Sequence, residues 1–234
     1  MSEPTLPPVA ALAGTAGASG AVLREAFSRS AARSSAPAQL AVSSRGETIV
    51  DLAHGIETDR PVQVFSVSKS LVAVAAAIAH DRGELDLDAP LADSWPAFDR
   101  AATRAITAMH VLDHSSGISA VAAPLGVEQL ISGELDAAVE RQDPLWEPGS
   151  AHAYGAFTFG ALMSGVFRHG LGVSVQDYVQ RELVGPSGAF FSFGADAALQ
   201  ERLAPLIFRP PVLTEAQAQE LMTGTALQDG SMLP

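Results

Sequence analysis

The chain has 234 residues, of which 47% are apolar, a composition typical of a folded globular domain with a well-filled core. Its net charge of −12 disfavours nucleic acid and acidic membrane surfaces as partners, because both bind clustered cationic side chains. No cysteine is present, which excludes disulfides, thiolate catalysis and thiolate metal sites.

The first residues predict neither a secretory signal nor a membrane anchor. The sequence MSEPTLPPVAALAGTAG lacks the basic start and the long apolar stretch of a signal peptide. The longest apolar run, Leu71 to Ala79, is too short to span a membrane. We therefore expect a cytoplasmic protein with no membrane association, in which residues 1–14 form a flexible tail.

The first half of the chain predicts a helix, a hairpin and a second, apolar helix. Residues 18–33 have the apolar spacing of an amphipathic helix. Residues 38–43 and 48–53 predict two strands that turn at Arg45-Gly46. Residues 71–83, LVAVAAAIAHDRG, are apolar nearly all round until the last few positions, so we expect a buried helix that ends at Gly83.

The second half predicts mainly helices and loops. Residues 84–100 indicate loop and short turns, and residues 107–112 indicate a short helix that leads into the loop 113–117. Four prolines favour loop over residues 184–212. A lone hairpin is marginal in water, so we expect an incomplete sheet whose further strands belong to a C-terminal continuation that this chain lacks. Further helices are expected at 126–132, 157–169, 174–182 and 214–222.

A serine and a lysine stand three residues apart at the start of the apolar helix. Ser66 and Lys69 would share one helix face, with their side chains in reach of each other. Of the 14 basic residues, Lys69 is the single lysine; arginine stays protonated in proteins and cannot replace an amine as a base. A serine with a lysine base is one of the known nucleophile pairs, although a serine at this spacing also arises by chance.

Several segments in order resemble one known family. The segment FSVSKS, followed by an apolar helix ending in RGELDLDAPLADSWPAF, is similar to the serine β-lactamase-like superfamily, which includes class C β-lactamases, D-Ala-D-Ala peptidases and β-lactamase-like carboxylesterases. HVLDHSSGI, WEPGSAHAYGAFTFGALM and ELVGPSGAFFSFGAD resemble later segments of that family, so the likeness covers about residues 39–196. It implies an α/β (α+β) fold over residues 15–234: an antiparallel sheet domain plus a mainly helical lobe over about 84–222.

The resemblance also implies roles for individual residues. Ser66 would be the nucleophile, Lys69 its base, and Tyr154 the second general acid/base that relays the proton to the leaving group. The other tyrosine, Tyr178, is better explained by core packing. We expect the substrate to be bordered by His152, Gly155 and Ala156.

Two departures from the family pattern bear on the substrate. Lactamases and peptidases of this family usually have an asparagine two residues after the tyrosine, where this chain has Ala156, which resembles the carboxylesterase branch. The third motif, a K-T-G or H-x-G strand, is not found, and a chain with one lysine excludes K-T-G. His110 and His114 flank a short helix end, where His114 is expected to shape the loop by hydrogen bonding.

The resemblance therefore implies hydrolysis of a small carboxylic ester through an acyl-enzyme, with no cofactor. A β-lactamase or D-Ala-D-Ala peptidase is the first alternative. An inactive truncated fragment, or a binding module that uses the same pocket, is the alternative of another class. No His/Glu cluster with metal-ligand spacing, no G-x-S-x-G elbow and no phosphate-binding glycine loop occurs in the sequence.

Overall fold

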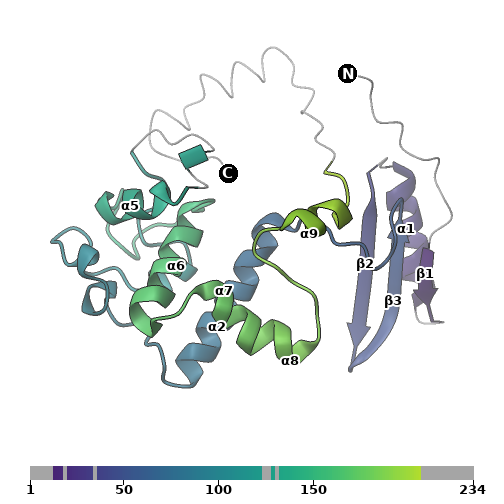
Figure 1. Ribbon diagram of the computed structural model, residues 1–234, viewed down its shortest axis with the longest axis horizontal. Helices are drawn as coiled ribbons and strands as arrows, with labels where there is room; N and C mark the ends of the chain where they lie inside the picture. The colour runs from purple at the N-terminus through teal and green to yellow at the C-terminus, as the bar shows by residue number, and fades with distance from the viewer. Residues whose placement is uncertain (1–12, 18–19, 34–35, 123–127, 130–131, 207–234) are drawn as a thin grey trace, which may run out of the picture. The chain divides into compact units, whose positions relative to one another are not determined.

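The computed structural model describes residues 13–17, 20–33, 36–122, 128–129 and 132–206 (Figure 1). These residues form two compact units. The first unit contains the described residues up to Gln63 together with those from Gly194 onward, and the second runs from Val64 to Phe193. The helical unit therefore begins ahead of the expected boundary near Glu84, and it includes the helix that follows Ser66.

The first unit contains a three-stranded antiparallel sheet in the order β1-β3-β2. The predicted hairpin is confirmed as β2 (Ala38–Ser44) and β3 (Glu47–His54). Its turn residues, Arg45 and Gly46, have φ of 53° and 82°, the left-handed conformations that tight two-residue hairpins require.

The central strand β3 pairs on its other edge with β1 (Ala13–Ala16). The first two residues of β1 belong to the segment predicted as a flexible tail. A side chain at Gly14 would place its Cβ 1.9 Å from the carbonyl oxygen of Asp51, so this position of β1 requires glycine. The strand pairing, rather than any alternation in the sequence AGTA, is what orders these residues.

The described residues of the first unit also form two α-helices. The predicted N-terminal helix is confirmed as α1 (Ala21–Arg33), which contacts β3. The helix α9 (Ala197–Arg202) lies in the stretch predicted as mainly loop. Its N-cap residue Asp196 accepts a hydrogen bond from the backbone N–H of Leu199 at 2.7 Å, a common device that starts a short helix.

The second unit is mainly helical and is organised around α6 (Thr158–Leu171), which contacts α2, α3, α5 and α7. The 3₁₀ turn η2 (Phe65–Val67) leads directly into α2. The described part of this unit also contains α2 Ser68–Asp81, η3 Leu91–Asp93, η4 Pro96–Phe98, α3 Ala108–Leu112, α5 Glu134–Arg141, α7 Val175–Val179, the π-helix η5 Gln180–Val184 and α8 Gly185–Ser187.

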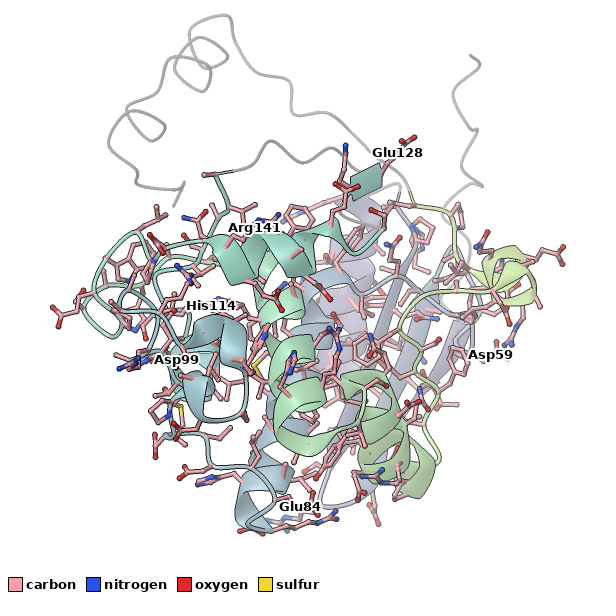
Figure 2. The ribbon with its side chains drawn as sticks, turned by 60° about the vertical axis from the view of Figure 1, so that its left-hand side comes forward. Asp59, Glu84, Asp99, His114, Glu128 and Arg141 are labelled. Carbon is pink, nitrogen blue, oxygen red and sulfur yellow. The ribbon has the colours of Figure 1, made fainter. Side chains whose placement is uncertain are left out.

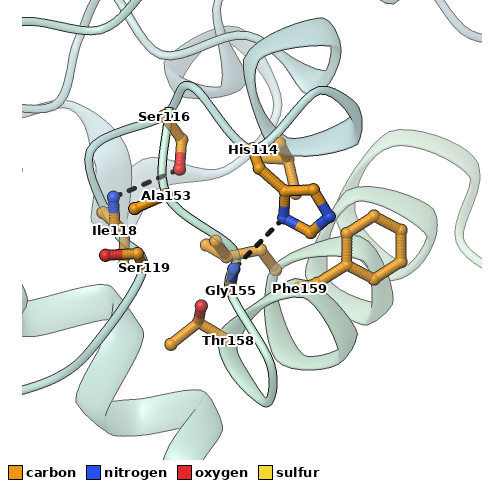
Figure 3. Close-up of a pocket in the computed structure, with 10 residues that line it drawn as sticks. His114, Ser116, Ile118, Ser119, Ala153, Gly155, Thr158 and Phe159 are labelled. Carbon is orange, nitrogen blue, oxygen red and sulfur yellow. Dashed lines mark hydrogen bonds between the residues drawn. The ribbon is translucent and has the colours of Figure 1, made fainter. Parts of the chain in front are cut away.

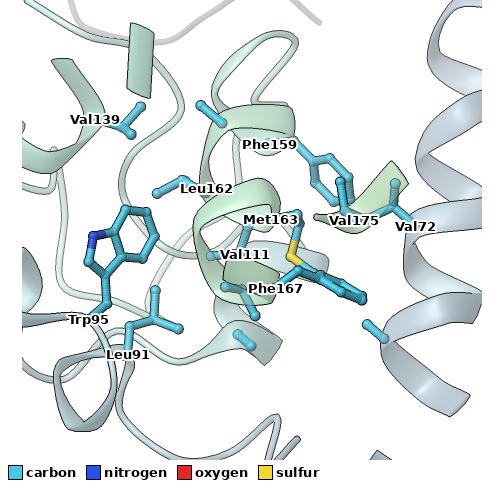
Figure 4. Close-up of a cluster of buried hydrophobic side chains, with 14 of the residues drawn as sticks. Val72, Leu91, Trp95, Val111, Val139, Phe159, Leu162, Met163, Phe167 and Val175 are labelled. Atoms are coloured by element: carbon cyan, nitrogen blue, oxygen red, sulfur yellow. The ribbon is translucent and has the colours of Figure 1, made fainter. Parts of the chain in front are cut away.

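The hydrophobic core of this unit packs around α6 (Figure 4). A side chain at Gly165 would place its Cβ 2.0 Å from the ring of Trp95, so the absence of a side chain lets the indole pack directly on α6. The indole is 2% exposed, and its N–H donates to Glu140 Oε1 at 3.0 Å. The largest fully buried side chains of this core are Tyr178, Phe98, Phe167, Ile106, Ile118, Leu162 and Met163.

The apolar helix is confirmed as α2, and it ends as predicted with Gly83 in the left-handed conformation after the C-cap residue Arg82. The expectation that it is buried all round is wrong, since Val74 is 47% exposed. Its buried positions have the i, i+3, i+4, i+7 spacing of a single helix face and are mostly alanine, which allows close helix packing: Val72, Ala75, Ala76 and Ala79.

Other helix predictions have mixed outcomes. The short helix after residue 107 is confirmed as α3, capped by reciprocal hydrogen bonds between Thr107 and His110, and the helix predicted at 157–169 is α6. The segment 174–182 forms α7 and then the π-helix η5, not one α-helix. The helix α5 was not expected. The predicted helix at 126–132 lies mostly outside the described residues, and that at 214–222 lies wholly outside them.

The packing prediction for Tyr178 is confirmed, because this side chain is 1% exposed and its hydroxyl donates to Glu84 Oε2 at 2.7 Å. Burial, together with Glu84, raises the pKa of Tyr178 to about 12.

Within the described ranges, no helix is long and apolar enough to cross a membrane.

Candidate active site

Ser66 lies in η2, one turn ahead of α2. The preceding residue, Phe65, has φ of 46°, a left-handed conformation that is uncommon for a bulky side chain and costs about 1–3 kcal/mol. The Ser68 hydroxyl donates to the carbonyl oxygen of Phe65 at 2.7 Å, and the Val67 N–H donates to that of Val64 at 3.1 Å. A strained turn fixed in this way presents Ser66 at the start of the helix, as the sequence predicted.

Lys69 links Ser66 to a second segment of the chain. Its Nζ donates to Ser66 Oγ at 3.1 Å and to the main-chain carbonyl oxygen of Ala156 at 3.0 Å. The same ammonium lies 5.0 Å from the ring centre of Tyr154 and 5.7 Å from that of Phe159, which are cation–π distances. The structure therefore brings Ser66, Lys69, Tyr154 and Ala156 together from segments far apart in the sequence.

The phenol of Tyr154 is part of this cluster. Its pKa lies below the ordinary value, because the hydroxyl of Ser66 and then the ammonium of Lys69 stabilise the ionised form more than desolvation disfavours it. The side chain is 49% exposed, so the group is open to a reacting molecule. A phenol that ionises more readily next to a serine hydroxyl can accept and return a proton in acid/base catalysis.

Gly155 and Ala156 follow Tyr154, but they have different surroundings. Gly155 is buried, and its N–H donates to His114 Nδ1 at 3.2 Å (Figure 3). A side chain at Gly155 would place its Cβ 2.6 Å from Thr158 Oγ1, so the loop passes too close to α6 for any larger residue. Ala156 is exposed and offers its carbonyl oxygen to Lys69. Gly155 thus supports the loop, while Ala156 lies at the cluster.

His152 lies on the same loop as Tyr154 and is mostly exposed. Its Nε2 is 3.9 Å from Asp113 Oδ2. Its place at the border of a substrate pocket stays a prediction. No group of three or more acidic or histidine side chains suited to a metal ion occurs in the part of the chain that the structure describes.

His114 has a larger part in the site than the sequence indicated. It was expected to shape its own loop, and its ring instead contacts Tyr154 and Phe159 across the chain, with ring centres 4.9 Å and 5.4 Å apart. His114 lies two residues after the end of α3 and is labelled in Figure 2. Its own segment, HVLDHSSGI, indicated a turn, and no local pattern pointed to the contact with Tyr154.

The chain is similar to known esterases and β-lactamases. The family model described as Beta-lactamase matches residues 23–226. The Esterase/beta-lactamase LipL of Mycobacterium tuberculosis is 30% identical over 156 residues, which are 63% of this chain and 36% of LipL.

Solved structures have the same fold. A penicillin-binding protein homologue from Caulobacter crescentus superposes with a TM-score of 0.80 at 26% identity, covering 88% of this chain and 58% of that one. A family VIII carboxylesterase superposes with a TM-score of 0.78 at 25% identity, covering 85% of this chain and 58% of that one. This chain thus spans little more than half the length of these structures. The predicted β-lactamase/transpeptidase-like α/β fold is confirmed, and the chain belongs to the beta-lactamase family, within the serine β-lactamase-like superfamily.

Proposed function

We propose that the protein hydrolyses carboxylic esters through an acyl-enzyme on Ser66, with Lys69 as base and Tyr154 as the second acid/base. The observation that supports this most directly is the 3.1 Å contact of Lys69 Nζ with Ser66 Oγ, beside a phenol of lowered pKa. The relatives named as esterases support the reaction class.

The acylation step uses the groups already in contact. In its neutral form, the Lys69 amine accepts the proton of Ser66 while Oγ attacks the ester carbonyl carbon. The oxyanion that forms lies at the start of a helix, where the backbone N–H of Ser66 can donate to it. When the carbon–oxygen bond to the alcohol breaks, Tyr154 donates its proton to the leaving oxygen and recovers one from the Lys69 ammonium.

Deacylation reverses these proton transfers with water in place of the alcohol. Water attacks the acyl carbonyl and loses a proton to the neutral Lys69 amine, either directly or through Tyr154, which accepts that proton while it passes its own to Lys69. The bond to Ser66 Oγ then breaks, Oγ takes up a proton, and the carboxylic acid leaves. Both half-reactions therefore use one small set of side chains within a single unit of the structure.

Ala156 favours an ester over a lactam or peptide. Its side chain is a methyl group, and its carbonyl oxygen is already bonded to Lys69, so this position offers no side-chain amide to bind a substrate amide. Exposed apolar side chains are the chain neighbours of two residues of the cluster: Phe65, 59% exposed, precedes Ser66, and Phe157, 64% exposed, follows Ala156. These features support a small apolar acyl group. Hydrolysis of a lactam or a D-Ala-D-Ala peptide is the second candidate, supported by the likeness to the penicillin-binding protein homologue.

A panel of p-nitrophenyl esters and a chromogenic cephalosporin tests the proposal. We expect turnover of acetate and butyrate esters, loss of turnover in Ser66→Ala, and full turnover in the control Ser70→Ala, which changes an exposed serine on the same helix. Turnover of the cephalosporin alone would favour the lactamase. No turnover of either by a folded chain would favour a binding module.

A further inference from the structure

The loop that carries Tyr154 is held on both sides by one residue. The N–H of Ala153, before Tyr154, donates to the backbone oxygen of His114 at 3.2 Å. The N–H of Gly155, after Tyr154, donates to His114 Nδ1 at 3.2 Å (Figure 3). The imidazole also packs against the Tyr154 ring itself. Three separate contacts thus join one histidine to the phenol and to both of its chain neighbours.

His114 is itself held firmly in place. It has φ of 64°, a left-handed conformation that for a non-glycine residue persists only where its surroundings enforce it. Its N–H donates to the carbonyl oxygen of Val111 at 3.2 Å, at the end of α3. Asp113 Oδ1 accepts from both the N–H and the hydroxyl of Ser115, at 2.9 and 2.6 Å, which fixes the chain on either side. The backbone of α3 therefore determines where the imidazole lies.

The hydrogen bond from Gly155 requires a neutral imidazole. Because Nδ1 accepts this hydrogen bond, the proton of the neutral ring is on Nε2. An imidazolium has N–H groups at both nitrogens, so protonation would replace the acceptor by a donor that faces the Gly155 N–H.

The surroundings of the imidazole favour this neutral form. Burial and then the nearby Lys69 ammonium lower the pKa of His114, and His152 adds to this, while only Asp113 raises it. The phenol of Tyr154 also faces the ring. The imidazole therefore stays neutral around pH 7.

We propose that His114 is the positioning residue for Tyr154, and that its neutral imidazole holds the phenol beside Ser66 and Lys69 through the Gly155 N–H. Protonation of His114 breaks this hydrogen bond, loosens the loop and lowers the rate at acidic pH. The effect on turnover rests on the ester hydrolysis proposed above, whereas the effect on the position of the phenol does not.

Two substitutions separate positioning from a purely structural role. In His114→Asn the side-chain amide oxygen can occupy the place of Nδ1 and accept the Gly155 N–H, it does not titrate, and asparagine tolerates left-handed backbone. His114→Ala removes the acceptor. We expect His114→Ala to lower kcat about 10- to 100-fold with KM changed less than about threefold, and His114→Asn to retain most of kcat. In His114→Asn, the fall in kcat at acidic pH should weaken, because the substituted side chain does not titrate.

The ionisation of Tyr154 gives a readout that needs no turnover. The chain has two tyrosines, and Tyr178 ionises near pH 12, so phenolate absorbance below that pH reports Tyr154. We expect the ionisation midpoint of Tyr154 to rise in His114→Ala and to return towards the wild-type value in His114→Asn, with folding checked by circular dichroism.

Two results would overturn the proposal: the same Tyr154 midpoint in wild type and His114→Ala, or an unchanged fall of kcat at acidic pH in His114→Asn. If His114→Ala does not fold, the His114→Asn profile alone decides. If the ionisation midpoint of Tyr154 changes with His114 but the chain has no esterase activity, the proposed function is refuted, while the positioning role of His114 is supported.

Discussion

Lys69 Nζ donates a hydrogen bond to the main-chain carbonyl oxygen of Ala156 at 3.0 Å. Lys69 is therefore attached to the loop that carries Tyr154 through the backbone, at the position where lactamases and peptidases of the family usually have an asparagine side chain. A backbone carbonyl is present whatever the side chain is, so position 156 can change without removing this contact.

This relationship predicts the result of Ala156→Asn. The residue is exposed, so an asparagine fits, and its amide would be available to bind the amide of a lactam. We expect faster acylation by a chromogenic cephalosporin, with ester turnover within about threefold of wild type, since the Lys69 contact remains. Ala156→Leu, of similar size but without an amide, is the control. Equal gains in both variants would show that side-chain volume, rather than hydrogen bonding, limits the lactam reaction.

Lys69→Arg tests whether the site needs an amine that can lose its proton. Arginine keeps a positive charge near Ser66, but it stays protonated and cannot act as a base. We expect kcat/KM for p-nitrophenyl acetate to fall about 10²–10⁴-fold, the usual contribution of a general base, with the folded state intact by circular dichroism. Activity within tenfold of wild type would mean that Lys69 supplies only charge.

Tyrosine titration tests the electrostatics of the cluster. The pKa of Tyr154 is lowered chiefly by Ser66, while that of Tyr178 is raised to about 12, so absorbance near 295 nm should show two separate steps. Tyr154→Phe should remove the earlier step and Tyr178→Phe the later one, and Ser66→Ala should move the earlier step to higher pH. A single step containing both tyrosines would contradict this arrangement.

The direction of the Tyr154 shift also sets how stability depends on pH. A phenol whose pKa is lower in the folded state than in the unfolded chain stabilises the folded state when it is ionised. This stabilisation is present above the pKa of the unfolded chain, about 10, and is lost as the pH falls through the pKa of the folded state. Urea unfolding of wild type and Tyr154→Phe should therefore differ more at pH 10 than at pH 8.

Two glycines on α6 form a matched pair for stability. A Cβ at Gly165 would lie 2.0 Å from the Trp95 ring, whereas a Cβ at Gly160 meets nothing within 4 Å. We expect Gly165→Ala to lower the free energy of unfolding by about 1–3 kcal/mol, as overpacked cores do. Gly160→Ala should raise it by about 0.5–1 kcal/mol, because alanine favours helix. Equal effects in urea denaturation would refute the packing of Trp95 on α6.

Local patterns in the sequence were sufficient to predict the structure of the segment that carries Ser66 and Lys69. The Ser66–Lys69 spacing, the apolar run of α2 and the stop at Gly83 all lie within one segment, so no tertiary information was needed. The hairpin was equally local, because Arg45-Gly46 can adopt the left-handed turn that joins β2 and β3.

Features that depend on distant contacts were missed. The strand β1 has no alternating pattern and is ordered by pairing with β3. The helix α5 is short and rich in charge, although Leu135, Ala138 and Val139 have the i, i+3, i+4 spacing that could have identified it. The role of His114 depends on two loops that meet only in the folded structure, so its own segment could indicate a turn but not the contact with Gly155.

Covalent labelling of the purified chain with a fluorophosphonate is the most direct test of the central claim that Lys69 activates Ser66. Intact mass and peptide mapping would locate the adduct, with Ser66→Ala and Lys69→Arg as variants and Ser70→Ala as the control. We expect one adduct on Ser66 that is absent in Ser66→Ala, strongly slowed in Lys69→Arg and unchanged in Ser70→Ala. A folded chain that forms no adduct, or one whose adduct lies on another serine, would contradict the account.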